Sequence, residues 1–110
     1  MENITPQKLY LVTREDLPPA QQAVQAAHAL TEYLLSHKDG ASRWYSTSNT
    51  LALLSVPTED SLSRLVDKAR RKGFVLSEFR EPDRSHELTA VAFEPKAKSL
   101  LRNLQLALRL

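Results

Sequence analysis

The order in which short apolar runs alternate with helical segments constrains the fold of this chain more than any other feature. Residues 9–13 and 51–56 are apolar, β-prone runs, typical of strands that are covered on both faces. Residues 75–79 and 88–93 are predicted to form two further strands. Strands that alternate with helical segments in this way predict an α/β fold.

Three segments of the sequence are predicted helices. Residues 18–35 begin with two prolines, which a first helical turn tolerates. A second helix is predicted over residues 59–72, because Thr58 is a good N-cap and Gly73 a natural terminator. Apolar residues recur at helical spacing over residues 97–108, and this pattern predicts an amphipathic C-terminal helix.

The predicted elements follow the order β-α-β-α-β-β-α. We therefore expect residues 1–110 to form one three-layer α/β domain, in which a mixed four-stranded sheet carries helices on both faces. The polar stretch 36–49 is expected to be a loop. Ligands of such sheets bind at the carboxyl ends of strands, which here are the loops after Thr13 and Phe79.

Two residue counts exclude several classes of enzyme. The 110 residues include no cysteine, which excludes disulfides, thiolate nucleophiles and cysteine zinc sites. The only glycines are Gly40 and Gly73, so neither a phosphate loop nor a dinucleotide-binding turn can form. The three histidines show no metal-ligand spacing that stands out. We therefore expect neither a metal ion nor another cofactor.

The charge and hydropathy of the chain bear on its partners. A formal net charge of +2 permits contact with nucleic acid without requiring it. No apolar run approaches the ~20 residues needed to cross a bilayer. The N-terminus lacks the basic and apolar parts of a secretion signal. We therefore expect a cytoplasmic protein without a membrane partner.

A polar stripe runs along the first predicted helix. At about 100° per residue, one face of this helix carries Gln21, Gln25, His28 and Glu32. Such a row of amide, imidazole and carboxylate groups can bind and polarise a carbonyl or an ester, with His28 as a base. The alternative is a solvated helix face on which His28 pairs with Glu32.

A second candidate is the charged segment 80–87, which contains one apolar residue and follows the third predicted strand. Its place at a strand end makes it a rim of the same site. The alternative is a charged surface turn that joins two strands.

Three segments carry a resemblance to a known family. Residues 9–17 read Leu-Tyr-Leu-Val-Thr-Arg-Glu-Asp-Leu, residues 23–29 read Ala-Val-Gln-Ala-Ala-His-Ala, and residues 81–86 read Glu-Pro-Asp-Arg-Ser-His. They resemble the strand exit, the helix motif Ala-Ala-Gln-x-x-His-Ala and the later signature Asp-Ala-Gly-Arg-Thr-Gln of type-2 peptidyl-tRNA hydrolases, typical of archaea and eukaryotes. The resemblance extends from Lys8 to about Leu108.

The resemblance implies a hydrolase that cleaves the ester between a peptide, or an N-blocked amino acid, and tRNA. Peptidyl-tRNA is then the partner, and a homodimer is the assembly that many family members form. In this role His28 would orient or deprotonate water, and Gln21 and Gln25 would hold the ester oxygens. Glu81 and Ser85 would position the imidazole or the ribose.

Three further residues are expected to bind substrate by the same resemblance: Arg84, Arg14 and Asp16. Arg84 would contact phosphate near the tRNA end. One departure concerns the chemistry, because Gln21 stands where the family has a lysine. A neutral amide forms hydrogen bonds roughly half as strong as charged ones, so the departure weakens oxyanion stabilisation.

The sequence is compatible with two other functions. The first is a non-catalytic module that binds the tRNA end or a peptide on the same fold, since Gln21 carries no charge. The second is a small dimeric interaction protein, in which the leucine-rich C-terminal helix makes the contact.

Overall fold

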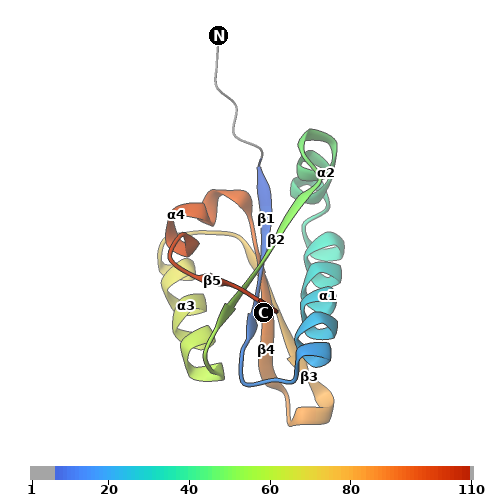
Figure 1. The fold of residues 1–110 in the computed structure, drawn as a ribbon. Helices are drawn as coiled ribbons and strands as arrows, with labels where there is room; N and C mark the ends of the chain where they lie inside the picture. Colours follow the sequence, from blue (N-terminus) through green and yellow to red (C-terminus); the bar gives the residue numbers. More distant parts are fainter. Residues whose placement is uncertain (1–6, 110) are drawn as a thin grey trace.

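A five-stranded mixed sheet forms the centre of the fold (Figure 1). The computed structural model describes residues 7–109. The sheet has the order β3-β4-β1-β2-β5. Its strands are β1 (Lys8–Arg14), β2 (Thr50–Val56), β3 (Leu76–Glu81), β4 (Glu87–Phe93) and β5 (Gln105–Leu106). β1 is parallel to β2, whereas β4 is antiparallel to both of its neighbours and β5 to β2.

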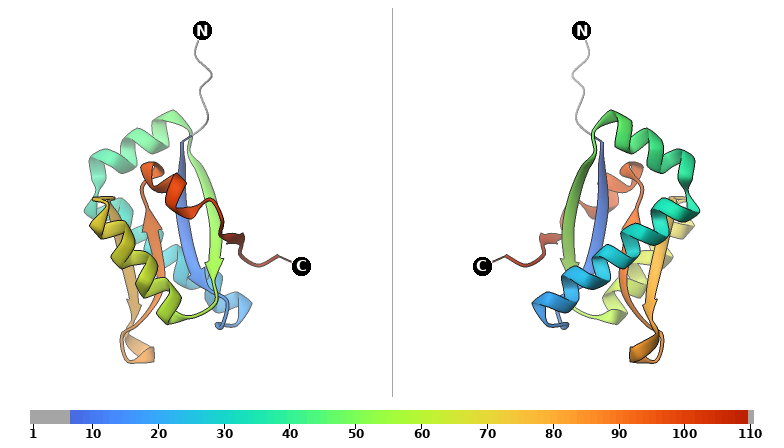
Figure 2. Two further views of the ribbon diagram at one scale, coloured as in Figure 1. Left: turned by 90° about the vertical axis from the view of Figure 1, so that its left-hand side faces the viewer. Right: turned by 90° about the vertical axis from the view of Figure 1, so that its right-hand side faces the viewer.

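Helices cover both faces of this sheet, as expected. They are α1 (Pro19–Ser36), α2 (Lys38–Thr47), α3 (Glu59–Arg71) and the short α4 (Lys98–Leu101). The views show α1 and α2 on one face, and α3 and α4 on the other (Figures 1 and 2). None of the helices within residues 7–109 is both long and apolar enough to cross a membrane.

The central strand β1 explains why its sequence is continuously apolar. Leu9 and Leu11 pack into the core under α1 and α2, whereas Tyr10 and Val12 pack into the core under α3. Because side chains alternate along a strand and both faces are covered, every position from Leu9 onward is buried. The four predicted strands and the first two predicted helices agree with the observed elements to within two residues at each end.

The start of α3 is held by a capping box. The Thr58 hydroxyl accepts a hydrogen bond from the Ser61 backbone N–H, and the Ser61 hydroxyl in turn accepts one from the Thr58 N–H. At the other end Gly73 has a φ of 79°, which suits glycine. Both termini therefore lie where the sequence predicts them.

Replacing Thr58 with alanine is expected to lower the free energy of unfolding by about 1 kcal/mol, because the Ser61 N–H loses its acceptor. Urea denaturation measures this difference. Thr58→Ser keeps the hydroxyl and should be close to wild type, so equal losses in the two variants would contradict the capping role.

The expected loop over residues 36–49 is wrong, because residues 38–47 form α2. Ala41 and Trp44 lie one turn apart and are buried in the core beneath this helix. The Trp44 indole N–H also donates to the Thr50 carbonyl at 2.7 Å. A helix with only two buried side chains in a polar sequence gives a weak periodic signal, which explains the error.

The expected C-terminal helix over residues 97–108 and the four-stranded sheet are also wrong. The helix ends at Leu101, whose side chain is buried in the core. The chain then turns and adds β5 to the edge of β2, pairing Leu106 with Leu54. Leu106 is 63% exposed, so its apolar character does not reflect a buried helix face. A dimer built on a long C-terminal helix therefore loses its structural basis.

Candidate functional site

The candidate site lies at one end of the sheet. β1, β2 and β3 run in the same direction, so the carboxyl ends of β1 and β3 meet there, beside the start of β4 (Figure 1). Arg14 ends β1, Glu81 ends β3 and Glu87 begins β4. The first turn of α1 follows the loop after β1, and the buried Gln22 amide ties the helix to this loop by donating to the Leu17 carbonyl at 2.7 Å.

Gln25 is the centre of a hydrogen-bonded network. Its side chain is 0% exposed, and its amide nitrogen donates to Glu81 Oε1 at 3.1 Å and to Gln21 Oε1 at 3.4 Å. Its amide oxygen accepts from Thr89 Oγ1 at 2.8 Å. Donors and acceptors thereby fix which way the amide faces. One carboxylate oxygen of Glu81 is held, and the other has no hydrogen-bond partner within residues 7–109.

Thr89 is a site residue that the sequence reasoning missed. The pairing of β3 with β4 shifts after Phe79, which pairs with Ala90, while Arg80 pairs with Leu88. Thr89 therefore has no opposite residue, and the bulge turns its hydroxyl toward α1. The available signal was a single polar residue within the apolar run 88–93, and the structure shows that this residue is fully buried.

His28 lies one turn beyond Gln25 on α1 and is exposed. Its imidazole stacks on the Phe79 ring, with centroids 4.4 Å apart and planes 10° apart. No ion pair joins His28 to Glu32 among the described residues, so the structure does not form the pair that a solvated face would use. The stack fixes the plane of an imidazole on the same helix face as the Gln25 network.

Arg14 is almost fully buried and is engaged by internal partners. Its Nε and Nη2 donate to the two oxygens of Asp16 at 2.9 Å each, and its Nη1 donates to Glu87 Oε1 at 2.8 Å and to the Leu88 carbonyl at 3.1 Å. Hydrogen bonding to Arg14 lowers the pKa of the carboxyls of Asp16 and Glu87. Arg14 and Asp16 thus stabilise the loop that follows β1. Their contact with substrate stays a prediction.

Arg84 and Ser85 lie in the turn between β3 and β4. Arg84 Nη1 is 3.4 Å from Glu87 Oε1, so two arginines share this carboxylate. Ser85 and His86 adopt left-handed φ values of 55° and 61°, a conformation that is uncommon away from glycine. No hydrogen bond within residues 7–109 connects Ser85 to the Gln25 network, which leaves it at the rim.

The Arg14 ion pairs predict a loss of stability in acid. The folded-state pKa values of Asp16 and Glu87 lie below their ordinary values near 4, so the pairs stabilise the fold above that pH. The contribution disappears as the pH falls through the lowered values. Urea denaturation at about pH 6 and about pH 3 should show a falling free energy of unfolding. An Arg14→Met variant should show a smaller fall, and an equal fall would contradict this origin.

No group of three or more His, Asp or Glu side chains within the described part of the chain is arranged to hold a metal ion. This end of the sheet carries the hydrogen-bonded carboxylate of Glu81, the exposed primary amide of Gln21, the imidazole of His28 and arginine side chains. Such groups can orient water, accept a proton and donate hydrogen bonds to a developing oxyanion.

Comparisons with known proteins bear on the family and the fold of this chain. The family model described as "Peptidyl-tRNA hydrolase PTH2" matches residues 7–110. Among curated proteins there is no significant match. A solved protein of unknown function from Agrobacterium tumefaciens is similar in structure, with a TM-score of 0.67 and 11% sequence identity. The match covers 94% of this chain and 98% of that one. At this identity the likeness shows the fold alone.

Proposed function

Because the chain belongs to the PTH2 peptidyl-tRNA hydrolase family, we propose that it hydrolyses the ester that joins a peptide, or an N-blocked amino acid, to tRNA. The observation that carries this proposal is the Gln25 network, which fixes one oxygen of Glu81 and leaves the other available. Family membership supports the reaction class, and the network supports the assignment of roles. Peptidyl-tRNA is an intermediate of translation, so the proposed activity would take place in the cytoplasm.

The proposed reaction begins with water at the free oxygen of Glu81. The water oxygen forms a bond to the ester carbonyl carbon while Glu81 accepts its proton. The bond from that carbon to the ribose oxygen then breaks, and the proton passes to the departing ribose oxygen. Negative charge develops on the carbonyl oxygen, where the exposed amide of Gln21 can donate a hydrogen bond.

Two residues act beside this centre in the proposal. His28, held flat against Phe79, would orient the attacking water or the ester. Gln25 is a positioning residue, because its buried amide is fully engaged by Glu81, Gln21 and Thr89. This differs from the expectation that Gln25 itself holds an ester oxygen. Arg84 and Ser85 would meet the phosphate and ribose from the rim.

Hydrolysis is tested with the purified full chain and N-acetyl-aminoacyl-tRNA, from which N-acetyl-amino acid should be released. His28→Ala is expected to slow this release by about tenfold or more, because general acid–base and positioning effects are of at least that size. Arg71→Ala, at the exposed end of α3 on the other face of the sheet, serves as a control for handling and folding. Equal rates for wild type and His28→Ala would overturn the role of this imidazole.

A binding module without turnover is the second candidate, and the neutral Gln21 favours it. Replacing Gln21 with lysine is expected to raise the hydrolysis rate constant by about tenfold, because a charged donor stabilises an oxyanion more strongly. Gln21→Met keeps the length without a donor and should be slower than wild type. If wild type binds tRNA without turnover and the lysine variant hydrolyses it, the binding module is the correct description.

A further inference from the structure

The outer edge of β3 is the sheet edge that lies at the candidate site. β3 comes first in the order β3-β4-β1-β2-β5, so β4 is the only strand of the described chain that pairs with it. The views place β3 at the margin of the sheet, on the side where α1 lies (Figure 2). A strand at a sheet margin presents a row of unpaired backbone N–H and C=O groups, which can pair with a further extended chain.

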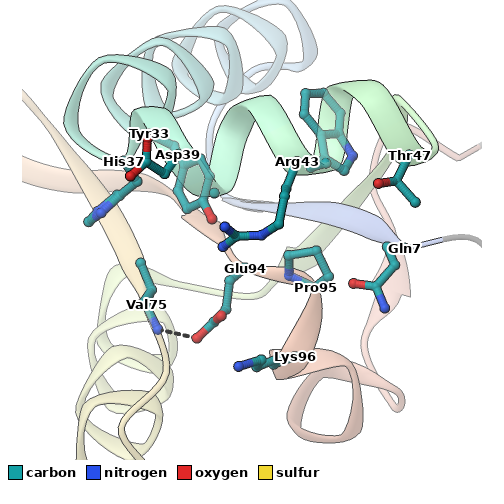
Figure 3. A pocket seen from close by; sticks show the side chains of 12 residues that line it. Gln7, Tyr33, His37, Asp39, Arg43, Thr47, Val75, Glu94, Pro95 and Lys96 are labelled. Atoms are coloured by element: carbon teal, nitrogen blue, oxygen red, sulfur yellow. Dashed lines mark hydrogen bonds between the residues drawn. The ribbon is translucent and has the colours of Figure 1, made fainter.

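The hydrogen bonds on the inner side of β3 show which of its residues face outward. Just before β3, Val75 donates its N–H to the Glu94 carboxylate at 2.6 Å and accepts from the Glu94 N–H at 3.0 Å (Figure 3). The Phe79 carbonyl accepts from a side-chain hydroxyl of β4 at 3.3 Å, and the Glu81 carbonyl accepts from the His86 N–H at 2.9 Å. Because successive strand residues turn their backbone groups to opposite edges, the residues between these positions face outward. They are Leu76, Glu78 and Arg80.

These three residues give the outer edge three donors and three acceptors. None of their backbone N–H and C=O groups forms a hydrogen bond within residues 7–109. An added strand would lie about 4.8 Å from β3, and up to about five of its residues would fit along this length. Pairing of this kind uses main-chain groups, so it does not require a particular side-chain sequence in the added chain.

The edge leads directly to the base of the proposed hydrolysis. Glu81 is the last residue of β3, its side chain receives the Gln25 amide at 3.1 Å, and the turn that carries Arg84 follows at once. A chain that runs parallel to β3 therefore brings its carboxyl end to Glu81, whereas an antiparallel chain brings its amino end there. In peptidyl-tRNA the ester is at the carboxyl end of the peptide. Only parallel addition thus places the bond to be cleaved beside the base.

The side chains beside this edge suit an extended peptide of varied sequence. On the α1 face, Phe79 carries the imidazole of His28, with ring centroids 4.4 Å apart. On the α3 face, Glu78 is engaged by Arg70 at 2.6 Å and by Arg80 at 3.1 Å. Alternate side chains of an added strand would meet these two surfaces in turn. A flat ring and an ion-paired cluster accept many kinds of side chain, so selection would come from the backbone.

We propose that the peptide part of peptidyl-tRNA adds to the outer edge of β3 as a parallel strand, with its ester at Glu81. The identity of this peptide rests on the proposed hydrolysis. The pairing would select peptidyl-tRNA over aminoacyl-tRNA, because a single amino acid has no peptide chain to place along the edge.

The efficiency of hydrolysis should therefore rise with peptide length. We expect kcat/KM for N-acetyl-tetra-alanyl-tRNA to exceed that for N-acetyl-alanyl-tRNA by about tenfold or more, because each net main-chain hydrogen bond contributes about twofold to tenfold. Equal values for the two substrates would overturn the proposal.

Binding is tested without turnover by a probe in which an amide joins N-acetyl-tetra-alanine to 3′-amino-3′-deoxyadenosine. Exchange of backbone amides with solvent is followed by NMR on the isotope-labelled full chain. With free probe at about ten times its dissociation constant, exchange at Leu76, Glu78 and Arg80 should slow by about tenfold. The control is β5, the strand at the other margin of the sheet, whose amides should be unaffected. Unchanged exchange at β3, or equal slowing at both margins, would overturn the proposal.

Two N-methylated probes test whether main-chain pairing holds the peptide. Methyl groups on the first and third alanine nitrogens, or on the second and fourth, block alternate N–H groups, and one of these sets faces β3. The two probes carry equal numbers of methyl groups, yet their dissociation constants should differ by about tenfold or more. Equal constants would overturn the pairing.

A variant of the protein tests the same contact from the other side. Glu78→Pro removes one outward N–H and leaves the bonds to β4 intact, as proline does on edge strands. It should bind the unmethylated probe about twofold to tenfold more weakly than Glu78→Ala, which loses the same side chain but keeps the N–H. Equal binding by the two variants would contradict the role of this N–H.

The direction of the added strand is read from a probe that carries a nitroxide in place of its acetyl group. Parallel addition predicts that amide signals broaden most near Leu76, where β3 begins. Strongest broadening near Glu81 would indicate antiparallel addition and would overturn the proposal.

A second copy of the chain is the competing occupant of this edge. Edge amides that exchange slowly without probe, and more slowly as protein concentration rises, would assign the edge to a second copy and overturn the proposal. Failure of the hydrolysis gives a different result. If the chain cleaves neither tRNA substrate while the probe protects β3, the proposed reaction is wrong and the peptide-binding edge stands.

Discussion

Replacing Glu81 with glutamine is expected to lower the rate constant of ester hydrolysis by about 100- to 1,000-fold, since the loss of a general base has effects of this order. The fold should be retained, because the new carbonyl oxygen can still accept the hydrogen bond from Gln25. What is lost is the oxygen that takes the proton from water. Single-turnover release of N-acetyl-amino acid from tRNA measures the difference.

Glu78→Gln provides the matched control for this substitution. Glu78 lies on the same strand and loses the same charge, but its partners are the side chains of Arg70 and Arg80. Its hydrolysis rate should stay close to wild type. Equal losses in the two variants would point to a general charge effect, and an unchanged rate for Glu81→Gln would remove Glu81 from the reaction.

Replacing Arg14 with methionine is expected to lower the free energy of unfolding by about 2–3 kcal/mol, since breaking a buried ion pair is costly. Methionine fills much of the same volume, so the loss reflects hydrogen bonds to Asp16, Glu87 and the Leu88 carbonyl. The partly exposed carboxylates can be rehydrated, which keeps the cost below that of a fully buried pair. Urea denaturation at neutral pH gives this value.

Arg64→Met is the control for the Arg14 substitution. Arg64 pairs with Asp60 one turn away on α3, and both side chains are exposed. Exposed pairs contribute about 0.2–1 kcal/mol, so this variant should be much less affected. If the two substitutions cost the same, the buried position of Arg14 has no special importance for stability.

The positions of strands β1 to β4 and of helices α1 and α3 along the chain follow from local sequence. Continuous apolar runs predict strands that are covered on both faces, and β1 is buried on both sides as its composition requires. Prolines, the N-cap at Thr58 and Gly73 mark helix ends by local chemistry. These signals do not depend on contacts between distant segments, so they were sufficient to place these strands and helices along the chain.

The parts that the sequence did not predict depend on contacts between distant segments. Gln25 and Glu81 are 56 positions apart in the sequence, and they meet only when α1 packs on β3. Thr89 joins them because of a shift in strand pairing, which no local pattern encodes. Likewise β5 forms because the edge of β2 offers free backbone groups, although the leucines nearby have helical spacing.

The position of β1 has a consequence for how the protein is made. This first strand lies between β2 and β4, so it pairs with residues some 80 positions further along the chain. Long-range pairing of this kind forms slowly, because a long loop must close before the contact is gained. During synthesis one edge of β1 therefore stays unpaired until β4 has left the ribosome. A chain that stops before β4 cannot complete its sheet.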